Sequence, residues 1–316
     1  MRLILSFMLC LLLIGCGREP EDRTFVSAVS VGGQEGQVKV CLRTSRGESG
    51  EEESENDGMV ICGTGKNIYG AIEDCAKKNS GELFFGHTSL CILSKNVTED
   101  KKMLWLVSKY IDEDAQVSRR IKLVAADDGE KVLKGSGQGT YAAQWLNEYY
   151  QTHKSEKPVD GNTLCRAMVE KGNLLLPVME SQKKGFKMTG GVLVANGEYA
   201  CDLTREESEQ IRLLINDGSK PYLTLNNNKE EIAKRVKVEY GRVKIEIKAK
   251  TKGGDGETTK DCAEEIRENA KKGLEILQRE NCDLINMYRA VEIEGYPQED
   301  FSKMPIEVQV TDKKVF

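Results

Sequence analysis

Residues 86–100, GHTSLCILSKNVTED, indicate how this chain alternates between strand and helix. The apolar centre of the stretch belongs to a predicted strand over Leu83–Leu93, and Asp100 begins a predicted helix that continues to Asp112. A further apolar run, Ile121–Ala126, predicts the next strand. A strand, a helix and a second strand in this order are typical of mixed α/β domains, in which helices cover a sheet.

A β-hairpin is predicted on the amino-terminal side of this unit. Val38, Val40 and Leu42 recur at every second position, which is the period of a half-buried strand. A short glycine-containing connection, Gly32–Gly36, separates them from a first predicted strand over Thr24–Val31. Two such runs around a short turn predict an antiparallel pair.

The chain changes character twice on the carboxyl-terminal side. A glycine-rich break at residues 135–139 precedes helices predicted over Thr140–His153 and Asn162–Lys171. The polar stretch 181–185 then marks a predicted domain boundary. From residue 186 onward the pattern is strand, helix, strand, strand, helix and strand, which predicts an α+β unit with a largely antiparallel sheet.

The helices of this last unit have recognisable start signals and apolar faces. Thr204 and Glu207 form a capping box, in which each side chain accepts a hydrogen bond from the other residue's backbone N–H. The longest predicted helix covers Asp261–Cys282. Its apolar residues lie on one face because they recur at helical spacing. These residues are Ile266, Ala270, Leu274 and Leu277.

The length of 316 residues exceeds what one hydrophobic core normally fills. We therefore predict an α+β protein that contains several mixed α/β domains with largely antiparallel sheets. The predicted segments are a lipoprotein signal peptide over 1–15, an N-terminal α/β domain over 16–134, a small middle helical or linker domain over 135–185 and a C-terminal α+β domain over 186–316.

The first sixteen residues resemble a bacterial lipoprotein leader. Arg2 is basic, and Leu3–Ile14 is apolar apart from Ser6, but this run is too short to cross a membrane as a permanent helix. The tripeptide Leu-Ile-Gly before Cys16 resembles a lipobox, so we predict cleavage before Cys16 and diacylglyceryl on its thiol. An ordinary cleaved signal peptide and an uncleaved anchor are the alternatives.

The charge distribution argues against nucleic acid as a partner. The chain carries 51 acidic and 46 basic residues, mostly interspersed, and its formal net charge is −5. Neutralising a phosphate backbone needs a concentrated basic face instead. The one acidic block, Glu48–Asp57, predicts a solvated loop, with cation binding as the alternative.

The ten cysteines divide into three groups. Cys10 leaves with the leader, Cys16 is the predicted lipid site, and eight others remain, which disulfides could pair in 105 ways. Cys41, Cys62 and Cys91 interrupt apolar, strand-like runs, where cysteine serves as a small hydrophobic residue. We predict that these three are buried and reduced. The sequence contains no Cys-x-x-Cys pair, so we predict neither a structural zinc site nor another metal site.

Catalytic residues are not predicted. The chain has two histidines, and we expect His87 to be a hydrogen-bonded structural residue and His153 to sit at a helix end, where a cation suits the helix dipole. No Gly-x-Ser-x-Gly motif occurs, and residues 63–67 lack the spacing of a phosphate-binding loop. We therefore expect no enzymatic activity and no cofactor.

Several stretches of the mature chain occur in an order that resembles one known family. After the lipobox and the hairpin, residues 86–100 place His87 near the start of a strand, and a helix and the acidic and arginine-containing segment 114–120 (DAQVSRR) follow. Residues 187–198 (KMTGGVLVANGE) supply a strand and a glycine turn before the acidic helix start at 203–207. This order resembles the spore germination Ger(x)C lipoprotein family, the C subunits of nutrient germinant receptors.

The chain departs from that family at two places. Residues 17–20 (GREP) stand where a Trp-Asp pair is usual after the lipidated cysteine. The long helix ends in Asp-Leu-Ile-Asn at residues 283–286, where the family has Asp-Ile-Phe-Gly. The chain is also shorter than is usual for the family.

The resemblance implies a function without catalysis. It implies three mixed α/β domains, lipid attachment at Cys16, and association with two integral membrane receptor subunits, of the A and B types. The location it implies is the outer face of the bacterial cell membrane or of the inner spore membrane. The alternative is a solute-binding lipoprotein of a transporter, which would have two similar lobes around an aromatic-walled cleft.

One aromatic group could serve a partner or the core. Tyr141, Trp145, Tyr149 and Tyr150 lie close together in the predicted middle helix. Large aromatic side chains often anchor interfaces. The Trp145 and Tyr149 side of the helix is therefore a candidate partner surface, and the alternative is that these rings fill the core between domains.

Overall fold

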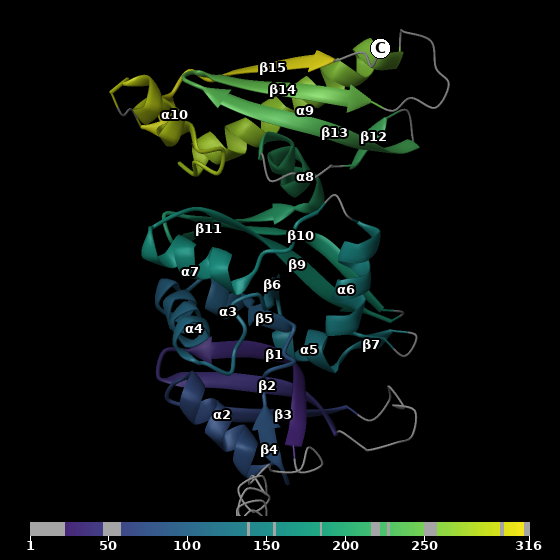
Figure 1. The fold of residues 1–316 in the computed structure, drawn as a ribbon, viewed down its shortest axis with the longest axis vertical. Helices are drawn as coiled ribbons and strands as arrows, with labels where there is room; N and C mark the ends of the chain where they lie inside the picture. The colour runs from purple at the N-terminus through teal and green to yellow at the C-terminus, as the bar shows by residue number, and fades with distance from the viewer. Residues whose placement is uncertain are drawn as a thin grey trace, which may run out of the picture.

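The computed structural model describes residues 23–46, 58–137, 140–153, 156–183, 185–215, 222–225, 228–249, 258–297 and 300–312. Cys16 and the acidic block Glu48–Asp57 lie outside these ranges. A nine-stranded sheet and a four-stranded sheet follow one another along the long axis of the molecule (Figure 1). A two-stranded ribbon, β7 (Ser136–Gly137) and β8 (Thr140–Tyr141), lies at the side of the larger sheet.

The larger sheet has the strand order β11-β10-β9-β6-β5-β1-β2-β3, with β4 beside β1. Its strands are β1 (Arg23–Gln34), β2 (Gln37–Arg46), β3 (Met59–Gly65), β4 (Glu82–Phe84), β5 (Leu90–Ser94), β6 (Lys122–Ala126), β9 (Leu174–Gln182), β10 (Gly185–Ala195) and β11 (Glu198–Thr204). Strands β1, β5, β6 and β9 are parallel to their neighbours in the centre, and an antiparallel three-stranded unit flanks each side. The predicted hairpin is confirmed as β1 and β2.

The predicted strand over Leu83–Leu93 is divided in the structure. Strand β4 pairs with the start of β1, where Leu83 lies opposite Thr24, and β5 pairs with its second half, where Leu90 lies opposite Ala28. Between them the chain makes a turn, closed by a 2.9 Å hydrogen bond from the Thr88 N–H to the Phe85 carbonyl. The apolar pattern is continuous over both strands because both are buried against β1.

Helices cover both faces of the larger sheet. They are α2 (Ile68–Lys77), α3 (Lys95–Thr98), α4 (Lys101–Glu113), α5 (Gly129–Lys134), α6 (Ala142–Thr152) and α7 (Gly161–Val169). Side chains of Asn67, Asp100, Asp128 and Asp160 accept backbone N–H bonds at the starts of α2, α4, α5 and α7, as N-cap residues do. One core packs against α2, α4 and α7, and a second packs against α5 and α6 on the opposite face.

The smaller sheet has the order β12-β13-β14-β15. Its strands and associated helices are β12 (Tyr222–Leu225), β13 (Asn228–Glu239), β14 (Arg242–Ala249), β15 (Glu307–Asp312), α8 (Arg205–Leu214), α9 (Thr258–Arg279), α10 (Met287–Glu294) and the 3-10 helix η2 (Phe301–Lys303). Gly241 makes the tight turn between β13 and β14, with φ of +64°. Strand β15 is parallel to β14, and β12, β13 and β14 are antiparallel.

Helix α8 connects the two sheets. Its predicted capping box is present, because the Thr204 hydroxyl accepts from the Glu207 N–H at 3.2 Å and the Glu207 carboxylate accepts from the Thr204 N–H at 2.8 Å. A third core joins α8, α9 and the smaller sheet to residues such as Leu175 and Leu193 of the larger one. The larger sheet therefore continues through residues 181–185, where the sequence placed a boundary, and the change of sheet follows at α8. The limits of the domains themselves stay a prediction.

Candidate functional site

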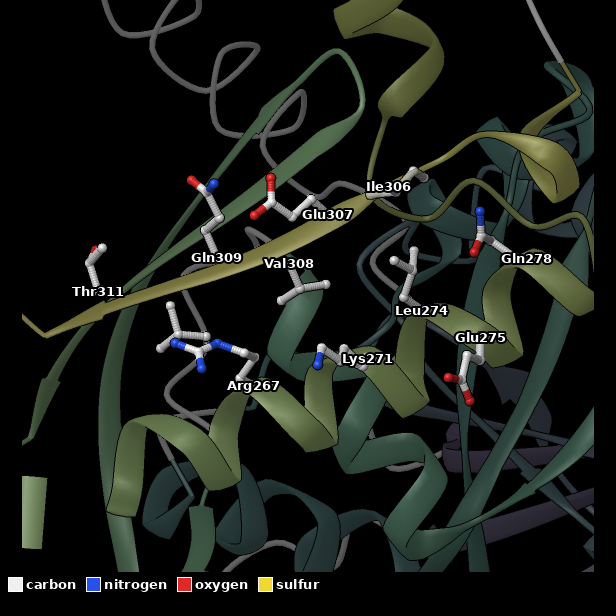
Figure 2. Close-up of a pocket in the computed structure, with 11 residues that line it drawn as sticks. Arg267, Lys271, Leu274, Glu275, Gln278, Ile306, Glu307, Val308, Gln309 and Thr311 are labelled. Carbon is white, nitrogen blue, oxygen red and sulfur yellow. The ribbon is translucent and has the colours of Figure 1, made fainter. Parts of the chain in front are cut away.

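A groove of about 830 Å³ separates helix α9 from the edge strand β15 (Figure 2). Helix α9 supplies one wall and β15, with the residue before it, supplies the other. The lining residues are Arg267, Lys271, Leu274, Glu275, Gln278, Ile306, Glu307, Val308, Gln309, Val310 and Thr311. The sequence predicted the helix and the strand, but nothing in it places these two distant segments side by side.

The base of the groove is apolar, and a glutamine side chain links its two walls at one end. Leu274, Val308 and Val310 are each at least nine-tenths buried at the base of the groove. The Gln278 amide nitrogen donates to the carbonyl of Met304 at 2.7 Å. The end of α9 is thereby held beside the segment that enters β15, and Arg267 lies at the other end, near Thr311 (Figure 2).

Charged side chains line the wall of the groove that α9 supplies, with basic residues toward one end and an acidic residue toward the other. Arg267 forms an ion pair with Glu264 one turn earlier in α9, and Lys271 lies 3.0 Å from the carboxylate of Glu268 in the same way. Glu275 follows them along the groove wall. Because the ion pairs lie along the helix, the basic side chains of Arg267 and Lys271 still face β15 (Figure 2).

The aromatic group in α6 packs against the protein rather than projecting from it. The Trp145 and Tyr149 rings stack with centroids 5.2 Å apart, and Trp145 also contacts Phe186 of β10 at 5.8 Å. The Tyr149 hydroxyl donates to Glu156 at 2.8 Å. These half-buried rings extend the core between α6 and the larger sheet, so they fill a core as the alternative predicted, but within this sheet.

The most exposed tryptophan is one to which sequence analysis gave no role. Trp105 of α4 is 45% exposed and lines a second groove, of about 380 Å³, together with Val169 of α7. Trp105 is not on the apolar face of α4, which Met103, Leu104 and Val107 form. A large aromatic residue outside the apolar face of a helix is the sequence signal that could have identified it as exposed.

The prediction that Cys41 and Cys62 are reduced is wrong. Cys41 and Cys62 form a disulfide between β2 and β3, with Cα atoms 4.1 Å apart. The two residues lie directly opposite each other in the antiparallel pair, so their side chains point to the same face of the sheet. Cys91 is buried and free, as predicted, and Cys75 and Cys282 are also buried free thiols.

Burial changes the acid–base behaviour of the free thiols. It raises the pKa of Cys75 to about 11, and that of Cys91 to about 12, because a thiolate loses its hydration in the core. A nucleophilic cysteine needs the opposite shift. These thiols therefore act as packing groups at neutral pH.

Raising the pH above about 9 is expected to destabilise the protein through these thiols. The unfolded chain releases each thiol proton near pH 9, whereas the folded chain keeps the Cys91 proton to about pH 12. Between these two pH values only the unfolded state has released the proton, so the free energy of unfolding falls by about 1.4 kcal/mol per pH unit for each such thiol. Urea denaturation at pH 8, 9 and 10 should show a steeper loss for the wild-type chain than for Cys91→Ala, and parallel losses would contradict the assignment.

The two histidines differ in burial: His87 is exposed, and His153 is partly buried. His87 is exposed in the turn between β4 and β5, with its ring 5.5 Å from Phe25 and 5.7 Å from Phe84. His153 caps the end of α6, as predicted, and stacks on Tyr149 with centroids 4.1 Å apart.

Within the described ranges, one group of three potential metal ligands lies close together. It consists of Cys41, Cys62 and Glu130. The two sulfur atoms are bonded to each other, and the Glu130 carboxylate accepts hydrogen bonds from Lys134 and Lys39, which lower its pKa. In this state the group does not offer a metal three free ligands.

No helix of the described segments has the length and apolar character needed to cross a membrane.

Comparison with known proteins identifies the family. Residues 17–181, more than half of the chain, match the family model described as the spore germination protein N-terminal domain. The crystal structure of the GerBC protein matches 91% of this chain and 97% of its own, with a TM-score of 0.51 and 15% sequence identity. This level of identity shows a common fold. A comparison with curated proteins found no match. The mixed α/β fold and the family match together show that the chain belongs to the Ger(x)C family of spore germination proteins.

Proposed function

We propose that this chain is the lipid-anchored C subunit of a nutrient germinant receptor, and that it binds partner subunits without catalysing a reaction. The family match over residues 17–181 carries the proposal. That match begins directly after Cys16, which is where a mature lipoprotein would begin. The partners proposed are the two integral membrane subunits of the receptor, of the A and B types.

The structure supports a definite orientation of such a subunit at the outer face of the membrane. Six residues, 17–22, lie between Cys16 and Arg23, where β1 begins, so the two Cα atoms are at most about 25 Å apart. Arg23 pairs with Glu82 of β4, at the end of the molecule opposite the smaller sheet (Figure 1). The lipid would therefore hold the β4 end near the membrane and leave the groove beside β15 far from it.

Deleting the gene is expected to slow or abolish the response of spores to particular nutrients and to leave sporulation intact. A receptor without one subunit cannot transmit its signal, whereas spore assembly does not use it. The measurement is the loss of optical density and the release of dipicolinic acid after single nutrients are added. A deletion strain that germinates normally with every nutrient would overturn the proposal.

Complementation with His87→Ala supplies a matched control. His87 is exposed and contacts the rings of Phe25 and Phe84 only at its edge of the sheet, so its removal should leave the fold and the nutrient response largely unaltered. If the variant accumulates normally in the membrane and the response is lost, His87 has a function that its surroundings do not indicate.

A further inference from the structure

We propose that the free edge of β15 binds an extended segment of a second, different polypeptide, which adds to the four-stranded sheet and lays its side chains into the groove against α9. This mode of binding is β-augmentation. The inference names the surface through which the subunit meets a partner, and it therefore rests on the proposed function.

The backbone of β15 has hydrogen-bonding groups directed away from its neighbour. The Glu307 N–H donates to the Gly241 carbonyl at 2.9 Å, on the β14 side. Successive residues of a strand direct their N–H and C=O groups to alternate sides, so those of Val308 and Val310 face the free edge. No further strand of the described ranges pairs there, because β15 is the last strand of its sheet.

The edge also lacks the usual protection against a further strand. Exposed edges are commonly blocked by lysine, proline or a bulge. Strand β15 reads Glu-Val-Gln-Val-Thr-Asp and contains neither lysine nor proline, and its pairing with β14 is regular over all six residues. Its two acidic residues stand at its ends, and the four residues between them are open to pairing within the described ranges.

The groove specifies the chemistry of the occupant. Side chains of an added strand alternate between the two faces of the sheet, so every second one enters the groove. Leu274, Val308 and Val310 form a floor that suits apolar side chains. Arg267, at the end of the groove near Thr311, suits an acidic residue there by charge complementarity.

A second copy of this chain fits the surface less well. The β15 edge faces along the long axis, away from the larger sheet (Figure 1). A copy added antiparallel to β15 is turned by half a turn about an axis normal to the sheet, so its larger sheet and its Arg23 point the opposite way. Two chains anchored through Cys16 in one membrane cannot meet in this arrangement.

Val308→Pro tests the edge directly. Proline removes the outward N–H of residue 308 and leaves the bonds of Glu307 and Gln309 to β14 in place, which is the position where an edge strand tolerates it. Val308→Thr is the matched control, because it changes the same buried side chain and keeps the N–H. Both variants are compared as full-length lipidated chains. The comparison requires that they accumulate equally in the membrane and have the same circular dichroism spectrum in detergent.

The binding readout uses a defined probe. It is a fluorescein-labelled octapeptide with valine at alternate positions, threonine between them and one terminal aspartate, titrated with the detergent-solubilised chain. Saturable binding by the wild type and Val308→Thr is expected, with affinity about tenfold weaker for Val308→Pro because one backbone hydrogen bond is lost. No saturable binding by the wild type, or equal affinity of the two variants, overturns the proposal.

Spore germination separates this proposal from the proposed function. If the deletion strain is defective and Val308→Pro germinates more slowly than Val308→Thr, both stand. If the deletion strain is defective and the two variants germinate alike, only the edge proposal fails. Gln309→Cys gives a third readout, since residue 309 would face its own copy in an antiparallel pair. A disulfide-linked product of twice the chain mass would show that a second copy occupies the edge and would overturn the choice of partner.

Discussion

Replacing Cys16 with Ala is expected to move the protein from the membrane fraction to the soluble fraction, or to leave it unprocessed with its leader attached. The wild-type thiol is predicted to carry two acyl chains, and each buried methylene adds about 0.8 kcal/mol to membrane affinity, so two chains hold firmly where one is marginal. Fractionation of cells with immunoblotting and intact mass measures the outcome.

Cys10→Ala is the control for this experiment. Cys10 lies within the apolar part of the leader, so its replacement should change neither processing nor location. The anchor assignment is wrong if Cys16→Ala retains both the mass and the membrane attachment of the wild type. An uncleaved leader that anchors the chain would give that result.

Removing the disulfide is expected to lower the free energy of unfolding by about 3 kcal/mol, from the loss of its restraint on the unfolded chain. Cys41 and Cys62 are 21 residues apart, so the bond closes the connection between β2 and β3. The double variant Cys41→Ala with Cys62→Ala should therefore unfold at a lower urea concentration. Reduced wild-type protein should show a similar loss, since the restraint is the same.

Two measurements decide this prediction. Adding a reductant should lower the urea midpoint of the wild type and leave that of the double variant unchanged. Alkylation of denatured, unreduced protein followed by peptide mass mapping should leave Cys41 and Cys62 unlabelled and Cys91 labelled. Labelling of all three would show that the bond is not formed in the isolated protein.

The disulfide shows where inference from sequence stops. The apolar runs around Cys41 and Cys62 correctly predict two strands, and the burial of Cys91 follows from the same kind of pattern. Which residues face each other depends on the register of β2 against β3, and the connection between them, residues 47–58, is too long for a tight turn to set this register. A local pattern therefore indicates burial but not pairing.

For the candidate groove, too, the local sequence predicts the elements but not how they are arranged. The capping box at Thr204 and the apolar stripe of the long helix predict α8 and α9 from local sequence. The groove requires in addition that β15 be the last strand of its sheet and parallel to β14, which only the tertiary arrangement determines. The prediction of largely antiparallel sheets does not specify the parallel centre of the larger sheet, although a continuous apolar run such as residues 90–93 is typical of a parallel strand buried on both faces.

The parallel centre of the larger sheet has a consequence for the order of folding. Strand β6 meets β9 only after nearly fifty further residues have been added, since β6 ends at Ala126 and β9 begins at Leu174. Contacts between distant segments form slowly. Residues 159–161 pair with one side of β6 at residues 121–123, and β9 pairs with the same side at Ala125. Until both segments dock, that side stays open to pairing with other chains, which is a known route to aggregation. A fragment that stops at residue 134 would keep it open permanently, so the amino-terminal half needs residues 159–161 and β9 to complete its sheet.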